Sequence, residues 1–499
     1  MKSFFYTIVA ATTFLCSCTT NDDPVADYPS DNPSIVSPSS FTASIDEAPS
    51  IDEVGSRVWI TLDGYAVWEN GDKVSINGKT YVTSTNGKQV EFVGDGALMV
   101  DGKYRVYFPA SIYKDPYHAV LPAEYKYTKE HYDMPMYAES DSTTLRFKNL
   151  CSILTVKVSH LDMDSISSIT LFSDKQMNGE FTVDLNDQNN EFLKFTEAPT
   201  WENKHVTIKC DTIETLRKGE SRVFHFPIPT QKDATLWVVV TGPNATKIMK
   251  TKNNAVTIKR SKYYSFEFGT KNSQTSCMPG EFSVSPTKKV HFAKSNLYWN
   301  GTPSDGKFYH FENNPTNHPS TRYYNHIGFF YWSKYADFAC MPSKYFDPNR
   351  TIDDKIFCDE EHKMTVDEED GFYALSGEEW EYMIGVTDED KYVAPHSKLK
   401  FDVKVGNQEH CMVIAPDGFA GDLENEYTLD DANALSLICL PPTTLFDGDY
   451  MWFSDIPFGY YWLADACNTD EGKVLYIDHW KACHKNLSRY MGCALRLVK

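Results

Sequence analysis

The first half of the sequence, after a short polar lead, consists of brief runs of alternating apolar and polar residues that end at turn signals. This period of two is typical of β-strands with one buried face. Tyr104–Phe108 is one such run, and Asn77-Gly78 separates two others. Asn-Gly predicts a tight hairpin because both residues accept a positive φ. Helical periodicity is nearly absent, so the spacing predicts two consecutive β-sandwiches, over residues 41–145 and 146–270.

The C-terminal part, residues 281–499, contains a helix signal that the first half lacks. Ser376-Gly-Glu-Glu379 is a capping box, in which the serine oxygen accepts from a helix N–H and Glu379 reaches back. The apolar face that follows consists of Trp380, Tyr382, Met383 and Val386. We therefore expect an α+β domain here, connected to the strand-rich half by a polar joint at residues 271–280.

Length, charge and cysteine usage limit what the chain can be. At 499 residues it is long enough for about two to four domains. Its formal net charge of -21 argues against nucleic acid as a partner. Most of the 12 cysteines lie after residue 275, which indicates a boundary there. Their spacing matches no zinc-site pattern, so buried or disulfide-linked cysteines are expected rather than a metal site.

The chain starts with Lys2 and an apolar run at residues 4–15, the pattern of an export signal too short to span a bilayer. The ending Leu15-Cys16-Ser17-Cys18 resembles a bacterial lipobox, which has a small residue before the lipidated cysteine. Ser17 before Cys18 fits this pattern. We expect a lipoprotein signal peptide at residues 1–17 and lipidation of Cys18, with a cleaved secretory peptide as the alternative.

Residues 18–40 are rich in Pro, Ser, Asp and Asn and contain almost no large apolar side chains. Such a segment cannot bury enough surface to offset its ordering entropy, so it is expected to be a flexible tether. Residues 19–23 resemble the acidic surface-export tag of Bacteroidetes lipoproteins. This resemblance implies a surface-exposed lipoprotein of the cell outer membrane. No later run reaches the roughly 18 apolar residues of a membrane helix, so the lipid would be the only anchor.

Several strings of the first half occur in the order found in the fimbrillin family of Bacteroidetes. Residues 67–76 (VWENGDKVSI) resemble the family's W-E-x-G-D-x-I segment. The later strings are residues 107–111 (YFPAS), 135–138 (PMYA), 147–150 (FKNL), 226–229 (FPIP) and 262–264 (KYY). The resemblance covers about residues 41–270 and implies two tandem transthyretin-like β-sandwiches. Within these strings, Trp68 and Phe108 are expected to be core aromatics and Gly71-Asp72 a turn.

The fimbrillin resemblance also implies a maturation site. In fimbrillins that polymerise, an arginine-specific protease removes the first strand, and the emptied groove receives a strand from another subunit. Arg57 follows a polar stretch and precedes the run at residues 58–62, so the resemblance implies cleavage there, with Val58 as the new first residue. An ordinary surface arginine is the alternative.

Residues 281–499 resemble a C-terminal module of Bacteroidetes surface proteins. The strings that carry this resemblance are residues 282–292 (FSVSPTKKVHF), 375–382 (LSGEEWEY), 416–418 (PDG), 440–441 (LP), 461–462 (YW) and 496–498 (RLV). The module looks related to the C-type-lectin-like fold shared with formylglycine-generating enzymes. The resemblance therefore implies a C-type-lectin-like head domain.

The sequence offers no catalytic constellation. The Arg-Gly-Gly-Ser segment that precedes the active cysteine of formylglycine-generating enzymes has no counterpart, and Cys483 and Cys493 lack that context. Nucleophile-elbow, phosphate-loop and zinc-protease motifs do not occur. The adjacent acids Glu378 and Glu379 are explained by the helix dipole at a helix start. We expect no enzymatic activity.

One acidic loop is a candidate for ligand or calcium binding. Asp447, Asp449 and Asp455 are interleaved with aromatic residues that include Trp452. Carboxylates suit calcium, and aromatic faces suit sugar rings. The ligand strings of calcium-dependent lectins are absent, and a solvated acidic loop is the simpler interpretation. We therefore expect no cofactor; calcium binding by this loop is the alternative, and no calcium-binding motif supports it.

Together these resemblances imply a non-catalytic, fimbrillin-like surface adhesin with a lectin-like head, and a fimbrial tip subunit is one form of it. The implied partners are the outer membrane through the lipid, fimbrial subunits through strand exchange, and a glycan or protein receptor. A C-terminal head argues against a shaft subunit, which needs a free C-terminal strand to donate. The alternatives are a surface glycan-binding lipoprotein of a nutrient-uptake system and an enzyme of the formylglycine-generating-like fold.

Overall fold

The computed structural model describes residues 37–47, 67–128, 133–160, 163–243, 246–250, 255–267, 275–299, 309–311, 330, 358–361, 363–367, 369–388, 391–443, 445–447, 450–452, 458–467, 471–489 and 491–499. Over these residues the fold is mainly β, as predicted, and includes two α-helices. Residues 38–499 form one compact unit by their contacts. The domain limits given above stay predictions.

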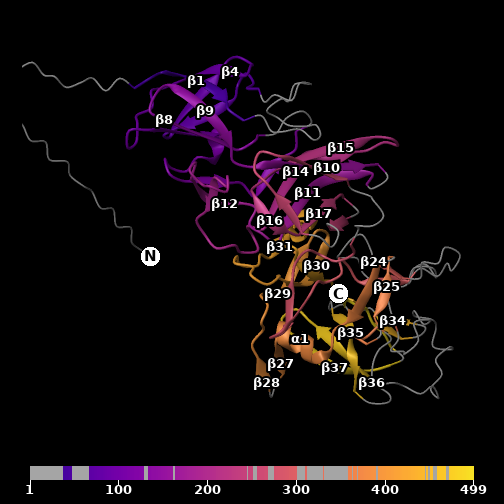
Figure 1. Cartoon of the computed structure of the whole chain (residues 1–499). Helices are drawn as coiled ribbons and strands as arrows, with labels where there is room; N and C mark the ends of the chain where they lie inside the picture. Colours follow the sequence, from indigo (N-terminus) through magenta and orange to yellow (C-terminus); the bar gives the residue numbers. More distant parts are fainter. Residues whose placement is uncertain are drawn as a thin grey trace, which may run out of the picture. The chain divides into compact units, whose positions relative to one another are not determined.

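The N-terminal strands form a closed barrel in the order β1-β4-β3-β2-β5-β8-β9. Strands β1, β4, β8 and β9 of this barrel are labelled in Figure 1. All neighbours are antiparallel except β1 and β9, which pair in parallel. An odd number of strands cannot alternate in direction all the way around a closed barrel, so one parallel pair is required. The strands are β1 (Ser40–Ile45), β2 (Lys73–Ile76), β3 (Lys79–Thr83), β4 (Gln89–Gly94), β5 (Tyr104–Phe108), β8 (Met136–Ser140) and β9 (Thr144–Asn149).

The predicted hairpin and the predicted core aromatics of this barrel are confirmed. Asn77 and Gly78 connect β2 to β3 with φ values of 44° and 89°, the left-handed conformation for which Asn-Gly is suited. Trp68 is fully buried, and its ring meets Phe92, Phe108 and Phe147 edge-on at centroid distances of 5.0–5.2 Å. The fimbrillin-like strings therefore supply core and turn residues here.

The next strands form two facing sheets. One sheet has the order β15-β10-β20 and the other β18-β17-β11-β14-β7, and one apolar cluster, with Val156 and Phe226 from the first and Leu171 and Val238 from the second, lies between them. The strands are β7 (Glu124–Lys126), β10 (Ser152–Ser159), β11 (Ser165–Ser173), β14 (His205–Thr215), β15 (Ser221–Ile228), β17 (Leu236–Thr241), β18 (Thr246–Lys250) and β20 (Tyr263–Glu267). The sequence predicts a β-sandwich over residues 146–270, and these two facing sheets lie there apart from β7, which comes from before that range. The sandwich predicted over residues 41–145 is instead the closed barrel described above.

Smaller elements complete this region. The short 3-10 helix η1 (Ala110–Ile112) follows β5. Two minor sheets have the orders β13-β12-β6 and β16-β19. Their strands are β6 (Ala119–Leu121), β12 (Gly179–Val183), β13 (Leu193–Phe195), β16 (Gln231–Ala234) and β19 (Val256–Ile258).

The C-terminal region consists of small sheets with two short helices, α1 (Gly377–Ile384) and α2 (Leu429–Ala434). Its strands are β21 (Phe282–Ser285), β22 (Lys288–Val290), β23 (Leu297–Trp299), β24 (Tyr309–Phe311), β25 (Met364–Val366), β26 (Glu369–Ala374), β27 (Val386–Asp388), β28 (Lys391–Val393), β29 (Leu399–Val405), β30 (Gln408–Ile414), β31 (Glu426–Tyr427), β32 (Ile438–Leu440), β33 (Leu445–Asp447), β34 (Tyr450–Trp452), β35 (Gly459–Ala466), β36 (Glu471–Ile477), β37 (Ala482–Ser488), β38 (Met491–Gly492) and β39 (Leu497–Val498).

Helix α1 begins where the capping box predicts. The Glu379 N–H donates to Ser376 Oγ at 3.3 Å, and the Ser376 N–H donates to Glu379 Oε2 at 2.8 Å. The helix ends at Gly385, whose φ of 73° and close approach to the Val393 carbonyl leave no room for a Cβ. Val386, which the sequence places on the helix face, therefore starts β27 instead.

The described cysteines include a group of buried thiols. Burial raises the pKa of each of them, so they are neutral core residues. The group consists of Cys151, Cys277, Cys358, Cys411, Cys439 and Cys493. In the part of the chain that the structure describes, no helix has the length and apolarity to cross a bilayer.

Replacing Trp68 with alanine tests the packing of the barrel. The substitution removes a fully buried ring, so we expect a loss of roughly 3–5 kcal/mol in the stability of the barrel. Calorimetry should show the corresponding unfolding transition at a lower temperature. Trp480→Ala is the matched control, because the Trp480 side chain is 76% exposed and its loss should change stability by less than about 0.5 kcal/mol. Equal effects of the two substitutions would contradict this packing.

Candidate functional site

Strand β1 occupies a position between β4 and β9, which we call the β1 slot. It runs antiparallel to β4, with Phe41 opposite Phe92, and parallel to β9, with Ala43 opposite Leu145. Because both edges of β1 are paired, its removal would leave β4 and β9 as two unpaired edges facing each other. Unpaired edges are templates for an incoming strand.

Strand β1 also contributes to the barrel core. Phe41 and Ala43 point inward and are 1% and 0% exposed. The Phe41 ring packs edge-on against Tyr81 and Tyr104, at centroid distances of 5.2 and 4.8 Å. A strand that fills the slot must therefore offer both backbone pairing and small or aromatic side chains at alternate positions.

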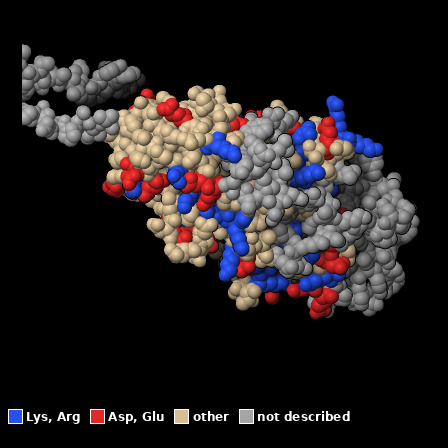
Figure 2. Space-filling view, turned by 45° about the horizontal axis from the view of Figure 1, so that its top comes forward, with Lys and Arg blue, Asp and Glu red and all other residues tan. Residues whose placement is uncertain are grey.

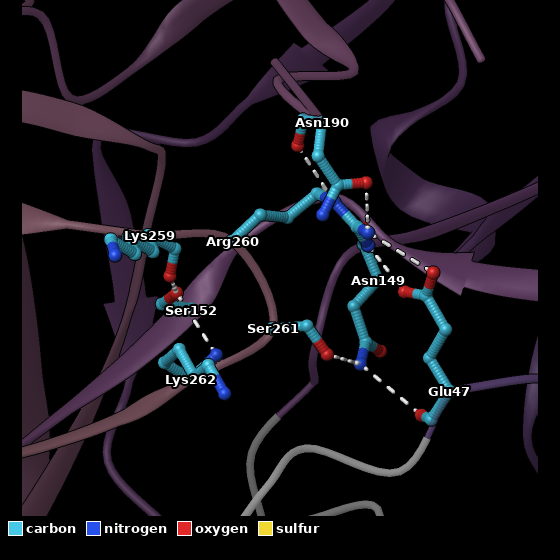
Figure 3. A network of polar contacts seen from close by, with 8 residues as sticks. All are labelled: Glu47, Asn149, Ser152, Asn190, Lys259, Arg260, Ser261 and Lys262. Carbon is cyan, nitrogen blue, oxygen red and sulfur yellow. Dashed lines mark hydrogen bonds and ion pairs between the residues drawn. The ribbon is translucent and has the colours of Figure 1, made fainter. Parts of the chain in front are cut away.

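Glu47, which lies two residues after the end of β1, is bound by a buried arginine (Figure 3). Arg260 has a side chain that is only 3% exposed, and it forms an ion pair with the Glu47 carboxylate through both terminal nitrogens. The Nη2–Oε1 distance is 3.0 Å. Paired planar groups of this kind form strong, directional contacts because each oxygen accepts its own N–H.

The same guanidinium binds two further residues of the sandwich and barrel. Nη1 donates to the Asn149 carbonyl at 2.8 Å, and Nε and Nη2 donate to the Asn190 carbonyl and side-chain oxygen at 3.0 and 2.7 Å. The face of the guanidinium lies 4.1 Å from the Phe192 ring centroid. We call Arg260, Glu47, Asn149 and Asn190 the Arg260 clamp. It fixes the chain directly after β1 to residues that are far away in the sequence.

A tight turn holds Arg260 in place. Ser152 Oγ donates to the Lys259 carbonyl and accepts from the Lys262 N–H at 3.2 Å, so one hydroxyl spans the turn (Figure 3). Ser261 adopts a left-handed φ of 59°, and its hydroxyl accepts from Asn149 Nδ2 at 2.8 Å. The turn therefore aims the arginine side chain inward.

The sequence did not reveal the clamp. Arg260 lies in the stretch Lys259-Arg260-Ser261-Lys262, which looks like an ordinary basic surface turn. Glu47 is one acid in a polar stretch. No local signal could have connected two residues this far apart.

The predicted processing residues Cys18, Arg57 and Val58 lie outside the described residues. Asp449 and Asp455 of the predicted ligand loop lie outside them as well. Asp447 and Trp452 lie at opposite ends of the hairpin β33–β34: Asp447 pairs with Tyr450 next to the turn, and Trp452 pairs with Leu445 at the outer end. The backbone thus brings these two strands together, and a calcium site there stays a prediction.

The C-terminal region contains an open pocket of about 350 Å³ beside the start of α1. Five carboxylates line it: Asp359, Glu360, Glu378, Glu379 and Asp465. Asp465 Oδ2 accepts from the Gly377 N–H at 2.6 Å, and Tyr382 adds an aromatic wall. The carboxylate oxygens are negatively charged hydrogen-bond acceptors, so the pocket suits a ligand with hydroxyl or ammonium groups that donate hydrogen bonds.

Lys288 partly neutralises this pocket. Its ammonium group donates to Glu379 Oε1 at 2.6 Å and to Glu360 Oε2 at 2.7 Å, and it lies 5.0 Å from the Tyr373 ring centroid. Burial lowers the pKa of Lys288, but these acidic partners outweigh burial and raise the pKa above its usual value. The lysine is therefore charged throughout the neutral range.

Among the described residues, one group has the composition and spacing of metal ligands: Asp402, His410 and His479. The hydrogen bond from His410 lowers the pKa of Asp402, so its carboxylate is ionised at neutral pH. The sequence contained no motif for this group, because its members come from two separate hairpins.

On the face shown in Figure 2, the charges of the described residues do not single out one site. Lysine and arginine side chains are interspersed there with aspartate and glutamate. The acidic excess of the whole chain is therefore not gathered on this face into one uniform patch.

Comparisons with known proteins do not assign the chain to a family. No family model matches the chain, and no curated protein matches it. Among solved structures, the chain is similar to a protein from Bacteroides ovatus described as "a putative cell adhesion protein". The match has a TM-score of 0.30 and 11% sequence identity, and it covers 48% of this chain and 95% of the other. Similarity at this level supports no conclusion about this chain.

Replacing Arg260 with methionine tests the clamp. The substitution leaves the Glu47 carboxylate and the two carbonyls without their donor, so the local stability of β1 should fall by about 3 kcal/mol. Amide hydrogen exchange of β1 should then become about a hundredfold faster. Arg222→Met is the control, because Arg222 pairs with Glu214 on the sandwich instead. Unchanged β1 exchange in Arg260→Met would contradict the clamp.

Proposed function

We propose that the chain is a non-catalytic surface adhesin of fimbrillin type, held to the outer membrane by a lipid on Cys18. The observation that carries this proposal is the β1 slot. One short strand near the start of the described chain closes the barrel, and cleavage after Arg57 would sever it from β2 and the strands that follow. The open edges of β4 and β9 would then accept a strand of another subunit.

The environment of the last described strand supports a tip or capping role. Leu497 and Val498 are fully buried, and β39 pairs with β26 through Tyr373 and Ala374. Next to them Arg496 is enclosed in the protein, and burial lowers its pKa to about 10. This segment is committed to the core of its own domain, so it is not available for donation to a neighbour. The subunit would accept a strand without donating this one.

Presentation of a receptor-binding head fits the C-terminal region. The pocket beside α1 would hold a hydroxyl-rich or amine-bearing group through its carboxylates and Tyr382. The same pocket favours the second candidate, a surface glycan-binding lipoprotein of a nutrient-uptake system, because such a protein needs a ligand pocket and no strand exchange.

Mapping the N-terminus of the native protein by mass spectrometry separates the candidates. We expect the form in sheared surface filaments to start at Val58, because the open β1 slot is needed for assembly. Arg57→Ala should abolish that form, while Arg146→Ala, at an exposed position of β9, should leave it unchanged.

The contrary result has an equally definite meaning. If the protein starts only at lipidated Cys18 and never enters filaments, the assembly proposal is wrong. Binding of a soluble polysaccharide that weakens in Asp465→Asn, and not in Asp422→Asn outside the pocket, would then support the glycan-binding candidate.

A further inference from the structure

Three potential metal ligands converge from two hairpins of the C-terminal region. Asp402 lies in β29, His410 in β30, and His479 in the turn between β36 and β37. His410 Nδ1 is 2.5 Å and His479 Nδ1 is 3.7 Å from the same oxygen, Asp402 Oδ1. One ligand atom from each residue lies within 4.8 Å of the others.

The backbone is unusual at two of these residues. Asp402 and His410 have φ values of 57° and 61°, in the left-handed region that few non-glycine residues adopt. The β29–β30 ladder shifts register on both sides of Val403. Irregular ladders of this kind redirect side chains, and strained backbone is concentrated at ligand sites. Here the irregularity accompanies two side chains that meet across the hairpin.

We propose that Asp402, His410 and His479 form a binding site for a divalent transition metal, with zinc as the best-suited ion. Two imidazoles and one carboxylate are borderline ligands that suit zinc, whereas calcium and magnesium require mostly oxygen donors. Ligand atoms on a tetrahedral zinc are about 3.3 Å apart, given bonds of about 2.0–2.1 Å. The side chains are 21–52% exposed, so small rotations can close the set around an ion.

A simple ion pair explains only part of this arrangement. A single hydrogen bond from His410 would satisfy Asp402, yet a second imidazole stands beside the first, with the ring centroids 4.9 Å apart and the planes at 83°. A single metal ion would bind one nitrogen of each ring together with the carboxylate. Three protein ligands leave a fourth position open to water or to a donor atom of a ligand.

The neighbouring residue supplies a spectroscopic probe. Trp480 is 76% exposed, and its ring centroid is 5.2 Å from that of His479. A paramagnetic ion such as copper(II), which binds the same ligand types, should therefore quench the fluorescence of this indole. Comparison with Trp480→Phe isolates this signal from that of the other tryptophans.

The test is zinc titration of the purified full-length chain by calorimetry and by metal analysis after dialysis. We expect His410→Asn and His479→Gln each to lose one zinc per chain, or to bind that zinc at least about tenfold more weakly. Asparagine is chosen at position 410 because it tolerates a left-handed φ. The copper quenching that depends on Trp480 should vanish in the same variants.

His118→Ala is the matched control. His118 Nδ1 lies 2.9 Å from Asp115 Oδ1, so this histidine also contacts an aspartate, but it does not belong to the group of Asp402, His410 and His479. Its loss should therefore leave zinc binding unchanged. If His410→Asn alters the fold by circular dichroism, His479→Gln decides the question. Equal zinc stoichiometry and affinity in the wild type and in His479→Gln would overturn the proposal, as would absence of zinc binding in the wild type.

Discussion

Backbone pairing of β1 along both of its edges is the interaction on which the N-terminal barrel depends. The other six strands of the barrel form an antiparallel sheet that ends at β4 and β9, and β1 alone closes it. Six residues thus determine whether two edges are satisfied or open. Phe41 and Ala43 add core contacts, but side chains of similar size from another strand could supply them. Pairing of β1 along both edges therefore closes the barrel firmly, and another strand with similar side chains would close it in the same way.

The Arg260 clamp adds a second constraint at the end of this strand. A buried guanidinium needs all of its N–H groups paired, and here Glu47 and two asparagines pair them. Loss of the Glu47 partner would leave a buried charge partly uncompensated. Release of β1 is thus opposed by a specific contact just after its last residue.

Local sequence patterns predicted much of the fold and little of the site. The Asn77-Gly78 hairpin, the buried Trp68 and the Ser376 capping box are local signals, and each has the predicted structure. The parallel pairing of β1 with β9 was missed, because alternation of apolar residues does not state which edges meet. Arg260 with Glu47 and Asp402 with His479 were missed for the same reason. These residues come into contact only when segments that are distant in the sequence fold together.

The C-terminal region brings together polar groups from separate elements around a shared apolar core. Its last described strand is buried, its acid-lined pocket opens beside a capped helix, and a His-Asp-His group lies on separate hairpins. Trp380 and Met383 of that helix are buried in the same apolar cluster as Val403 and Cys411 of the β29–β30 hairpin.

The most direct test of the central claim is strand exchange in the β1 slot. A specific protease site at residues 54–57 would allow the purified chain to be cut, and an isotope-labelled peptide of residues 38–47 would then be added. Native mass spectrometry should show the labelled peptide replacing the original strand, whereas a peptide with Phe41→Asp should not bind. Equal binding of the two peptides, or binding of neither, would contradict the claim that β1 is an exchangeable strand.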